Sequence, residues 1–203
     1  MLDRLKLLEQ LGVFIVRDFI DIQLCRQMLA EIRQVKRFQP GFVSEERTLD
    51  ENSRKVLVTR LFKPVIQTVV GRLSAIKPQL EARFKVELVD YQGPDFLFYR
   101  KGGFYGPHRD REDGDSQRRR VIVVIFVNGE RRTGKSDAAE IDTYEGGELV
   151  FCDLLEGEKA TRVGLSPTGQ PGLLVAFDSA VLHEVKPVTR GDRVTITTWF
   201  LTE

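Results

Sequence analysis

The chain has 203 residues, a hydrophobic fraction of 41% and a formal net charge of +1. A chain of this length is typical of one domain that buries roughly 70% of its unfolded surface, so it needs no disulfide bonds for stability. The near-neutral charge gives no general case for nucleic acid as a partner, and no apolar run is long enough to cross a membrane. Charges from Asp3 onward interrupt the N-terminus, which does not resemble a signal peptide, so we expect a cytoplasmic location.

The first third of the chain predicts helices. Three leucines at three-residue steps before Gly12 predict a first helix and its end: Leu5, Leu8 and Leu11. A second helix is predicted after the N-cap Asp21, from one apolar stripe: Ile22, Cys25, Met28, Leu29, Ile32 and Val35. Pro64 opens a third helical run, and Pro78 predicts the start of another short helical turn. The polar segment 38–55 has neither period and predicts a loop, a candidate lid.

From Val86 onward the pattern becomes that of strands. Five segments are rich in β-branched and aromatic residues: 95–99, 121–127, 148–151, 173–177 and 194–200. Many short strands without helices between them favour an antiparallel sandwich or jelly roll over a parallel sheet. The hydrophilic segment 129–144 predicts an exposed loop, the second candidate lid. We therefore expect a mainly β (α+β) protein, with a helical support region at 1–85 and a jelly-roll core at 86–203.

Two further groups of residues are open to more than one interpretation. Five arginines crowd one segment, with Glu112, Asp113 and Asp115 among them: Arg109, Arg111, Arg118, Arg119 and Arg120. They predict either a solvated, self-compensating loop or a basic rim that attracts an acidic substrate or partner. The two cysteines, Cys25 and Cys152, are isolated in apolar contexts and predict buried, reduced thiols; the alternative is a disulfide or a ligand role.

The most complete set of metal-ligating residues includes both histidines of the chain, His108 and His183. His108 and Asp110 are two residues apart, so their side chains point to the same side of an extended segment. His183 follows the strand that ends near Asp178, and we expect it to reach the same ion from the facing sheet. Either histidine alone would more often be a structural residue. Together with Asp110 they predict the two-histidine, one-carboxylate set that leaves positions open on Fe(II).

Arg193 stands ten residues after His183. On the predicted strand it shares one face with Thr195, Thr197 and Trp199. An arginine that points into a barrel costs free energy unless a carboxylate meets its guanidinium. A bound dicarboxylate cosubstrate would supply that carboxylate, with the Thr195 hydroxyl as a second donor. The alternative is a surface arginine on the outer face of the strand.

One longer pattern joins these residues: Tyr99-x-x-Gly102-x-x-Tyr105-x-x-His108-x-Asp110, then Gly146-Gly147-Glu148-Leu149, then His183-Glu184-Val185-x-Pro187-Val188 and Arg193-x-Thr195 with Trp199. This pattern resembles the 2-oxoglutarate and Fe(II)-dependent dioxygenases of the prolyl 4-hydroxylase type. The match covers roughly half of the chain, from about Tyr99 to the C-terminus. The N-terminal helices correspond only loosely to the helical support that such enzymes place against a double-stranded β-helix.

The resemblance implies a role for each residue of the pattern. His108, Asp110 and His183 are implied to be the catalytic iron ligands. Arg193, helped by Thr195, is implied to bind the distal carboxylate of 2-oxoglutarate. Tyr99 is implied to hydrogen-bond the cosubstrate and Tyr105 to face the substrate. Either ring could instead contribute to packing alone. The pair Gly146-Gly147 is implied to form a tight turn.

The implied reaction is hydroxylation of an unactivated C–H bond with O2, giving succinate and CO2, with ascorbate as a further candidate cofactor. The first hypothesis for the substrate is a prolyl residue of a protein or peptide. The alternative is a free amino acid or other small biosynthetic intermediate. Nucleic-acid demethylases of the same superfamily fit less well, because they carry a second arginine six residues after the first, where this chain has Trp199. The carboxylate of Asp110 argues against a halogenase, and the full residue set argues against a non-catalytic binding or sensing module. The sequence leaves the oligomeric state open.

Overall fold

The computed structural model of the chain describes residues 4–35, 38–41, 52–59, 63–112, 114–131, 143–154 and 169–203. The helices are α1 (Arg4–Gln10), α2 (Ile22–Gln34), α3 (Lys63–Phe84) and the 3-10 helix η1 (Gly114–Arg118). The strands are β1 (Phe14–Val16), β2 (Gln39–Pro40), β3 (Arg54–Lys55), β4 (Leu57–Thr59), β5 (Asp90–Tyr99), β6 (Phe104–His108), β7 (Arg119–Phe126), β8 (Gly129–Glu130), β9 (Thr143–Gly146), β10 (Leu149–Phe151), β11 (Leu174–Asp178), β12 (His183–Val185), β13 (Val188–Arg190) and β14 (Arg193–Leu201). Within these ranges, no helix has the length and apolar character needed to span a membrane.

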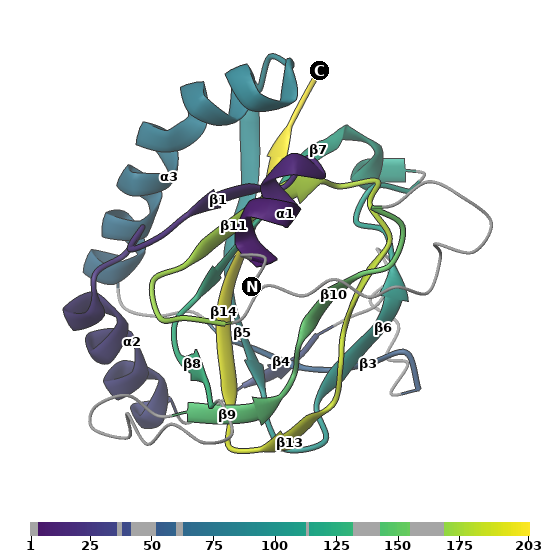
Figure 1. The fold of residues 1–203 in the computed structure, drawn as a ribbon. Coiled ribbons are helices and arrows are strands. Elements are labelled where there is room, and N and C mark those ends of the chain that lie inside the picture. Colours follow the sequence, from purple (N-terminus) through teal and green to yellow (C-terminus); the bar gives the residue numbers. More distant parts are fainter. Residues whose placement is uncertain are drawn as a thin grey trace.

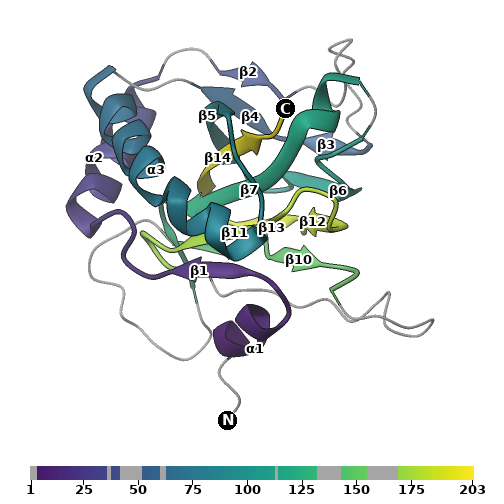
Figure 2. The ribbon, with the colours of Figure 1, turned by 90° about the horizontal axis from the view of Figure 1, so that it is seen from above.

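The strands form one large sheet and a smaller sheet that faces it (Figures 1 and 2). The large sheet has seven strands in the order β1-β11-β7-β14-β5-β4-β2, and the smaller sheet has four in the order β10-β12-β6-β3. A third set, β13-β9-β8, lies at one end of the molecule (Figure 1). Strand pairing within the two main sheets is antiparallel. The predicted mainly β fold with N-terminal helices is confirmed.

The central strand β7 shows why its sequence is a continuous apolar run. Successive side chains of a strand point to opposite faces of the sheet. On one face, Val121, Val123 and Ile125 pack in a cluster that includes residues of α2 and α3. On the other face, Ile122, Val124 and Phe126 pack in a cluster that includes residues of β10 and β12. Both faces of β7 are therefore buried, the first by the helices and the second by the smaller sheet.

Helices α2 and α3 cover one face of the large sheet (Figure 2), whereas Leu5 and Leu8 of α1 pack in the cluster on the other face. The predicted N-cap of α2 is confirmed, because the backbone N–H of Leu24 donates to Asp21 Oδ1 at 2.9 Å. The predicted new start at Pro78 is wrong, because α3 continues through this residue to Phe84. Proline removes one helical hydrogen bond. The buried side chains on either side of Pro78, those of Ile76 and Leu80, keep the helix packed on the core.

The N-terminal part of the chain also contributes strands to both sheets. Strand β1 pairs with β11, and β4 pairs with β5. The ends of the segment 38–55, predicted as a loop, form β2 and β3. Their pairing partners β4 and β6 lie outside this segment, so its own pattern does not predict these strands. Residues 42–51 of that segment lie outside the described residues. The same holds for residues 132–142 of the segment 129–144, whose ends form β8 and β9.

Candidate metal centre and anion pocket

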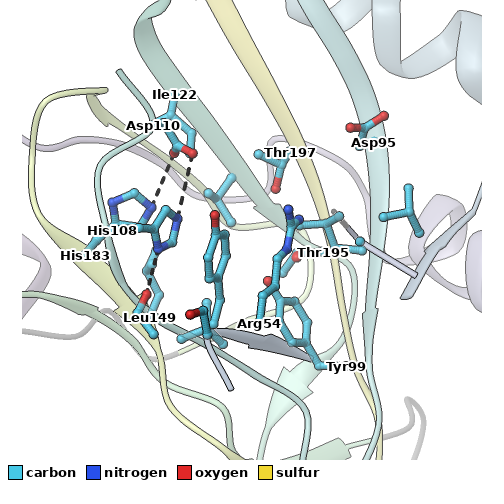
Figure 3. Close-up of a pocket in the computed structure, with 18 of the residues that line it drawn as sticks. Arg54, Asp95, Tyr99, His108, Asp110, Ile122, Leu149, His183, Thr195 and Thr197 are labelled. Carbon is cyan, nitrogen blue, oxygen red and sulfur yellow. Dashed lines mark hydrogen bonds and ion pairs between the residues drawn. The ribbon is translucent and has the colours of Figure 1, made fainter. Parts of the chain in front are cut away.

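Three side chains converge where β6 ends and β12 begins. His108 is the last residue of β6, His183 is the first residue of β12, and the two are register partners. Asp110 follows two residues after His108, and its backbone N–H donates to the Ser179 carbonyl at 3.0 Å. One ligand atom from each of the three residues lies within 4.8 Å of the others, and Figure 3 shows Asp110 facing both rings. These residues could hold a metal ion.

The origin of His183 differs from the prediction. We expected it on the sheet that faces His108, but β12 and β6 are neighbours in the smaller sheet. Strand order depends on contacts between segments far apart in the sequence, and local patterns carry no signal for it. The two rings therefore lie side by side on one sheet, with centroids 4.2 Å apart.

The hydrogen bonds of the two rings determine which nitrogen faces Asp110. His108 Nδ1 lies 2.8 Å from the Gly106 carbonyl, and His183 Nδ1 lies 2.9 Å from the Val181 carbonyl. A carbonyl can only accept, so Nδ1 of each neutral ring donates its proton and Nε2 keeps its lone pair.

These Nε2 lone pairs point toward a carboxylate. His108 Nε2 is 3.8 Å from Asp110 Oδ1, and His183 Nε2 is 3.3 Å from Asp110 Oδ2. Asp110 Oδ2 is buried and has no hydrogen-bond partner among the described residues. Converging lone pairs without a shared proton repel one another, and a divalent cation between them would remove that repulsion. The chemistry of the donor set therefore fits a metal such as Fe(II).

The ionisation states are those that metal ligands require. Burial, helped by the neighbouring His183, lowers the pKa of His108 to about 4. Burial alone would raise the pKa of Asp110, but positive charge on the neighbouring imidazoles when they are protonated, and on Arg119, brings it down to about 2. At neutral pH His108 is therefore neutral and Asp110 is ionised, so neither must lose a proton to bind a metal.

Arg193 lies inside the molecule at the start of β14. It is 1% exposed, and its guanidinium carbon lies 5.1 Å from the Tyr99 ring centre and 5.2 Å from that of Phe126. Nη1 donates to Thr195 Oγ1 at 3.4 Å, while Nε has no partner among the described residues. None of the ion pairs between described residues includes Arg193. The alternative of a surface arginine is wrong. A buried guanidinium without an ion pair among the described residues is stabilised by a bound anion.

Two residues that support Arg193 were not singled out for this role from the sequence. Tyr144 is 1% exposed, and its hydroxyl forms a hydrogen bond with the Arg193 guanidinium. Gly147 has a φ of +68°, and a Cβ atom there would lie 2.9 Å from Arg193 Cδ. Gly146 and Gly147 both have positive φ, but Gly146 still belongs to β9, so the tight turn stays a prediction. The close approach of Gly147 to Arg193 in β14 joins distant parts of the chain, so the two glycines alone could not predict it.

The two tyrosines of the pattern have different surroundings. Tyr99 is the register partner of Arg193, is 2% exposed, and has its pKa raised by burial. The Tyr105 ring stacks on the His108 ring, with centroids 3.4 Å apart, and the Arg54 guanidinium carbon lies 4.5 Å from the Tyr105 centroid. The sequence does not predict a position for Arg54 beside Tyr105, because the segment that contains Arg54 has the pattern of a loop. Tyr105 thus lies between a candidate metal ligand and a cation.

A single cavity of about 1560 Å³ connects these features. It is lined by the three metal-ligating side chains and by the predicted inward face of β14: Arg193, Thr195, Thr197 and Trp199. In Figure 3, Thr195 and Thr197 lie on the far side of the cavity from His108 and His183. A bound molecule could therefore contact the metal at one end and the guanidinium at the other.

The five crowded arginines have partners outside their own segment. Arg109 pairs with Asp153 at 2.7 Å, and both Arg111 and Arg120 pair with Asp178, at 3.5 and 3.1 Å. The remaining two bind Thr202 and Gln92. Three of the five charges are thus compensated by carboxylates of other elements, while the partners of Arg118 and Arg119 are neutral. Both cysteines are free, as predicted, but only Cys25 is buried and Cys152 is half-buried.

Comparison with known proteins agrees with this geometry. The model of the 2OG-Fe(II) oxygenase superfamily matches residues 94–201. A PKHD-type hydroxylase of Maricaulis maris is 27% identical over 157 residues, which cover 77% of this chain and 59% of that protein. The chain spans about half the length of the curated relatives it matches.

Two solved structures share the fold over nearly the whole chain. A Pseudomonas putida prolyl-4-hydroxylase is 23% identical with a TM-score of 0.72, covering 95% of this chain and 93% of its own. A Trichoplax adhaerens prolyl hydroxylase, in complex with a hypoxia inducible factor peptide fragment, is 19% identical with a TM-score of 0.70, covering 97% and 86%. The predicted jelly-roll core with helical support is confirmed.

Proposed function

Because the chain belongs to the 2OG-Fe(II) oxygenase superfamily, we propose that it is a dioxygenase that hydroxylates an unactivated C–H bond with Fe(II), 2-oxoglutarate and O2. One observation carries the proposal: a single cavity contains both a converging set of lone pairs and a buried guanidinium. The first calls for a divalent cation and the second for a carboxylate. A metal with a dicarboxylate cosubstrate satisfies both.

His108, Asp110 and His183 are the proposed Fe(II) ligands. When bound, Fe(II) and 2-oxoglutarate supply the chemistry of O2 reduction coupled to oxidative decarboxylation, with succinate and CO2 as products. The chain's own contribution is orientation. The backbone carbonyls that bind each Nδ1 hold the rings with Nε2 toward Asp110. The low pKa of Asp110, about 2, keeps it ionised.

Arg193 is the proposed partner of the distal carboxylate of 2-oxoglutarate. The aromatic rings of Tyr99 and Phe126 and the Tyr144 hydroxyl hold its guanidinium in place. Such a pre-organised cation, shielded from water, binds a carboxylate more strongly than an exposed one does. Thr195 is the proposed second donor to the same carboxylate, and Tyr99 the proposed hydrogen-bond partner of the cosubstrate.

A prolyl residue of a protein or peptide is the proposed substrate. The named activity of both structural neighbours, prolyl hydroxylation, supports this choice, and one neighbour was solved with a peptide. The cavity of about 1560 Å³ has room for a peptide beside a small cosubstrate. Tyr105, stacked on His108, is the proposed contact on the substrate side.

The test is incubation of the protein with Fe(II), 2-oxoglutarate, labelled O2 and a library of proline-containing peptides, followed by mass spectrometry. We expect one labelled oxygen atom on proline and an equal amount of succinate. Asp110→Ala is the matched control and should give neither product. Labelled oxygen on a free amino acid or another small molecule, with no labelled peptide, would replace the prolyl substrate with the alternative. No Fe(II)-dependent succinate in any mixture would contradict the dioxygenase itself.

A further inference from the structure

The turn of residues 178–182, between β11 and β12, holds the candidate metal ligands through its backbone. The Ser179 carbonyl accepts the backbone N–H of Asp110 at 3.0 Å. The Val181 carbonyl accepts Nδ1–H of His183 at 2.9 Å. The position of this turn therefore affects ligands on both segments of the site.

One carboxylate outside this turn connects the two ligand-bearing segments. Asp153 Oδ2 pairs with Arg109 Nη2 at 2.7 Å, and Asp153 Oδ1 accepts the Leu182 backbone N–H at 2.8 Å. Arg109 is the middle residue of the His-x-Asp step, and Leu182 immediately precedes His183. Arg109 Nη1 also donates to the Ala180 carbonyl. Asp153 thus bridges the first two ligands to the third.

We infer that Asp153, acting through Arg109 and Leu182, is a positioning residue that holds His183 at its metal-binding separation from His108 and Asp110. Without a metal, the lone pairs of the three ligands repel one another and tend to separate. The β6–β12 ladder is irregular between His183 and Val185, so it constrains this end of the strand pair less. A bridge between the two segments opposes that separation.

The inference rests on the proposed Fe(II) site, and it predicts that loss of the bridge changes metal affinity much more than stability. The bridge is partly exposed, with side-chain exposures of 43% for Arg109 and 24% for Asp153. Exposed ion pairs contribute little to overall stability. Residues that orient metal ligands change metal affinity by about 10–100-fold. Loss of Asp153 should therefore weaken metal binding far more than it lowers the melting temperature.

Three substitutions separate the contributions of the bridge. Asp153→Ala removes both contacts, whereas Asp153→Asn keeps an oxygen that can accept from Leu182 and loses the ion pair. Arg109→Ala removes the same ion pair from its other side, together with the hydrogen bond to the Ala180 carbonyl. Lys186→Ala is the matched control, because it deletes a pair of equal length, Lys186 Nζ to Glu184 Oε1 at 2.7 Å. This pair joins a residue of β12 to the residue that follows the strand, so it does not connect the two ligand-bearing segments.

The measurement is anaerobic calorimetric titration of each full-length, metal-free variant with Fe(II), together with its melting temperature and its Kd for 2-oxoglutarate once metal is saturating. We expect Asp153→Ala to raise the Fe(II) Kd about 10-fold and Asp153→Asn to raise it less. Arg109→Ala should raise it at least as much as Asp153→Asn, because it also loses the contact with the Ala180 carbonyl. Lys186→Ala should leave the Fe(II) Kd unchanged, and the 2-oxoglutarate Kd should stay constant throughout.

Two results would overturn the inference: an Fe(II) Kd for Asp153→Ala equal to that of Lys186→Ala, or additive effects in the Arg109→Ala, Asp153→Ala double variant. If Asp153→Ala does not fold, Asp153→Asn and Arg109→Ala carry the same comparison. Failure of the wild-type protein to bind Fe(II) is a separate result, since it removes the proposed function itself.

Discussion

His108 and His183 are register partners on neighbouring antiparallel strands, and each ring hydrogen-bonds the backbone carbonyl two residues before it. The shared pattern gives both imidazoles the same tautomer and directs both Nε2 atoms toward Asp110. This arrangement suits the proposed cation site.

The first prediction concerns the metal ligands. His183→Ala or Asp110→Ala should weaken Fe(II) binding by at least about 100-fold, the upper end of the effect of residues that only orient ligands. Each variant should also lose Fe(II)-dependent succinate formation. Anaerobic calorimetry measures the first quantity and chromatography the second. Wild-type Fe(II) affinity in both variants would remove these residues from the metal site.

The second prediction concerns Arg193. Arg193→Ala should raise the Kd of 2-oxoglutarate by about 10–100-fold, because hydrogen bonds to charged groups contribute about 1.5–3 kcal/mol. Its Fe(II) affinity should not change. The matched ligand is 2-oxopentanoate, which lacks the distal carboxylate and should bind the variant and the wild type equally. A loss of affinity that is the same for both ligands would show that Arg193 does not bind that carboxylate.

The third prediction separates backbone strain from contact with Arg193. Gly147 and Gly102 both have positive φ, +68° and +79°, but only at Gly147 would a Cβ atom meet Arg193 Cδ, at 2.9 Å. Gly102→Ala should cost about 1–2 kcal/mol of stability. Gly147→Ala should cost more, because its Cβ atom would also lie 2.9 Å from Val188 Cγ2. Only Gly147→Ala should also weaken 2-oxoglutarate binding. Equal 2-oxoglutarate Kd values for the two variants would contradict the proposed role of this close approach.

The fourth prediction concerns the stability of the metal-free protein in acid. His108 has a pKa of about 4 in the folded protein against 6.5 for an ordinary histidine, so between these values the unfolded chain binds more protons. The free energy of unfolding should therefore fall as pH drops from about 6.5 to about 4, by on the order of 3 kcal/mol. Asp110, with a pKa lowered from 3.8 to about 2, extends the loss to lower pH.

Denaturant titrations across this pH range check the fourth prediction, with His108→Ala as the control. The variant lacks the group that titrates, so its stability should depend less on pH between about 6.5 and 4. An identical pH dependence in the variant and the wild type would assign the acid sensitivity to another group.

Sequence patterns could predict the features that depend on local periodicity. The inward face of β14 follows from its two-residue period, which places Arg193 beside Thr195 in the cavity. The N-cap at Asp21 follows from the helical stripe after it. The positions of His108 and Asp110 on one side of the chain follow from their spacing. In each case the determining residues are close together in the sequence.

The features that were missed depend on contacts between distant segments. The sheet that carries His183 is determined by the pairing of β12 with β6. The contacts of Tyr144 with Arg193, and of Asp153 with Leu182, join elements that only the complete fold brings together. Continuation of α3 past Pro78 depends on burial of its neighbours against the sheet. No local pattern records these partners.

The central claim is that one cavity binds Fe(II) and 2-oxoglutarate together, with Arg193 at one end and the His108, Asp110 and His183 set at the other. Anaerobic titration of the Fe(II)-loaded protein with 2-oxoglutarate, followed by the visible absorption of the metal chelate, tests it most directly. We predict a saturable absorption band in the wild type, a much higher half-saturating concentration in Arg193→Ala, and no band in Asp110→Ala. Absence of the band in the wild type, or the same titration curve in all three proteins, would contradict the claim.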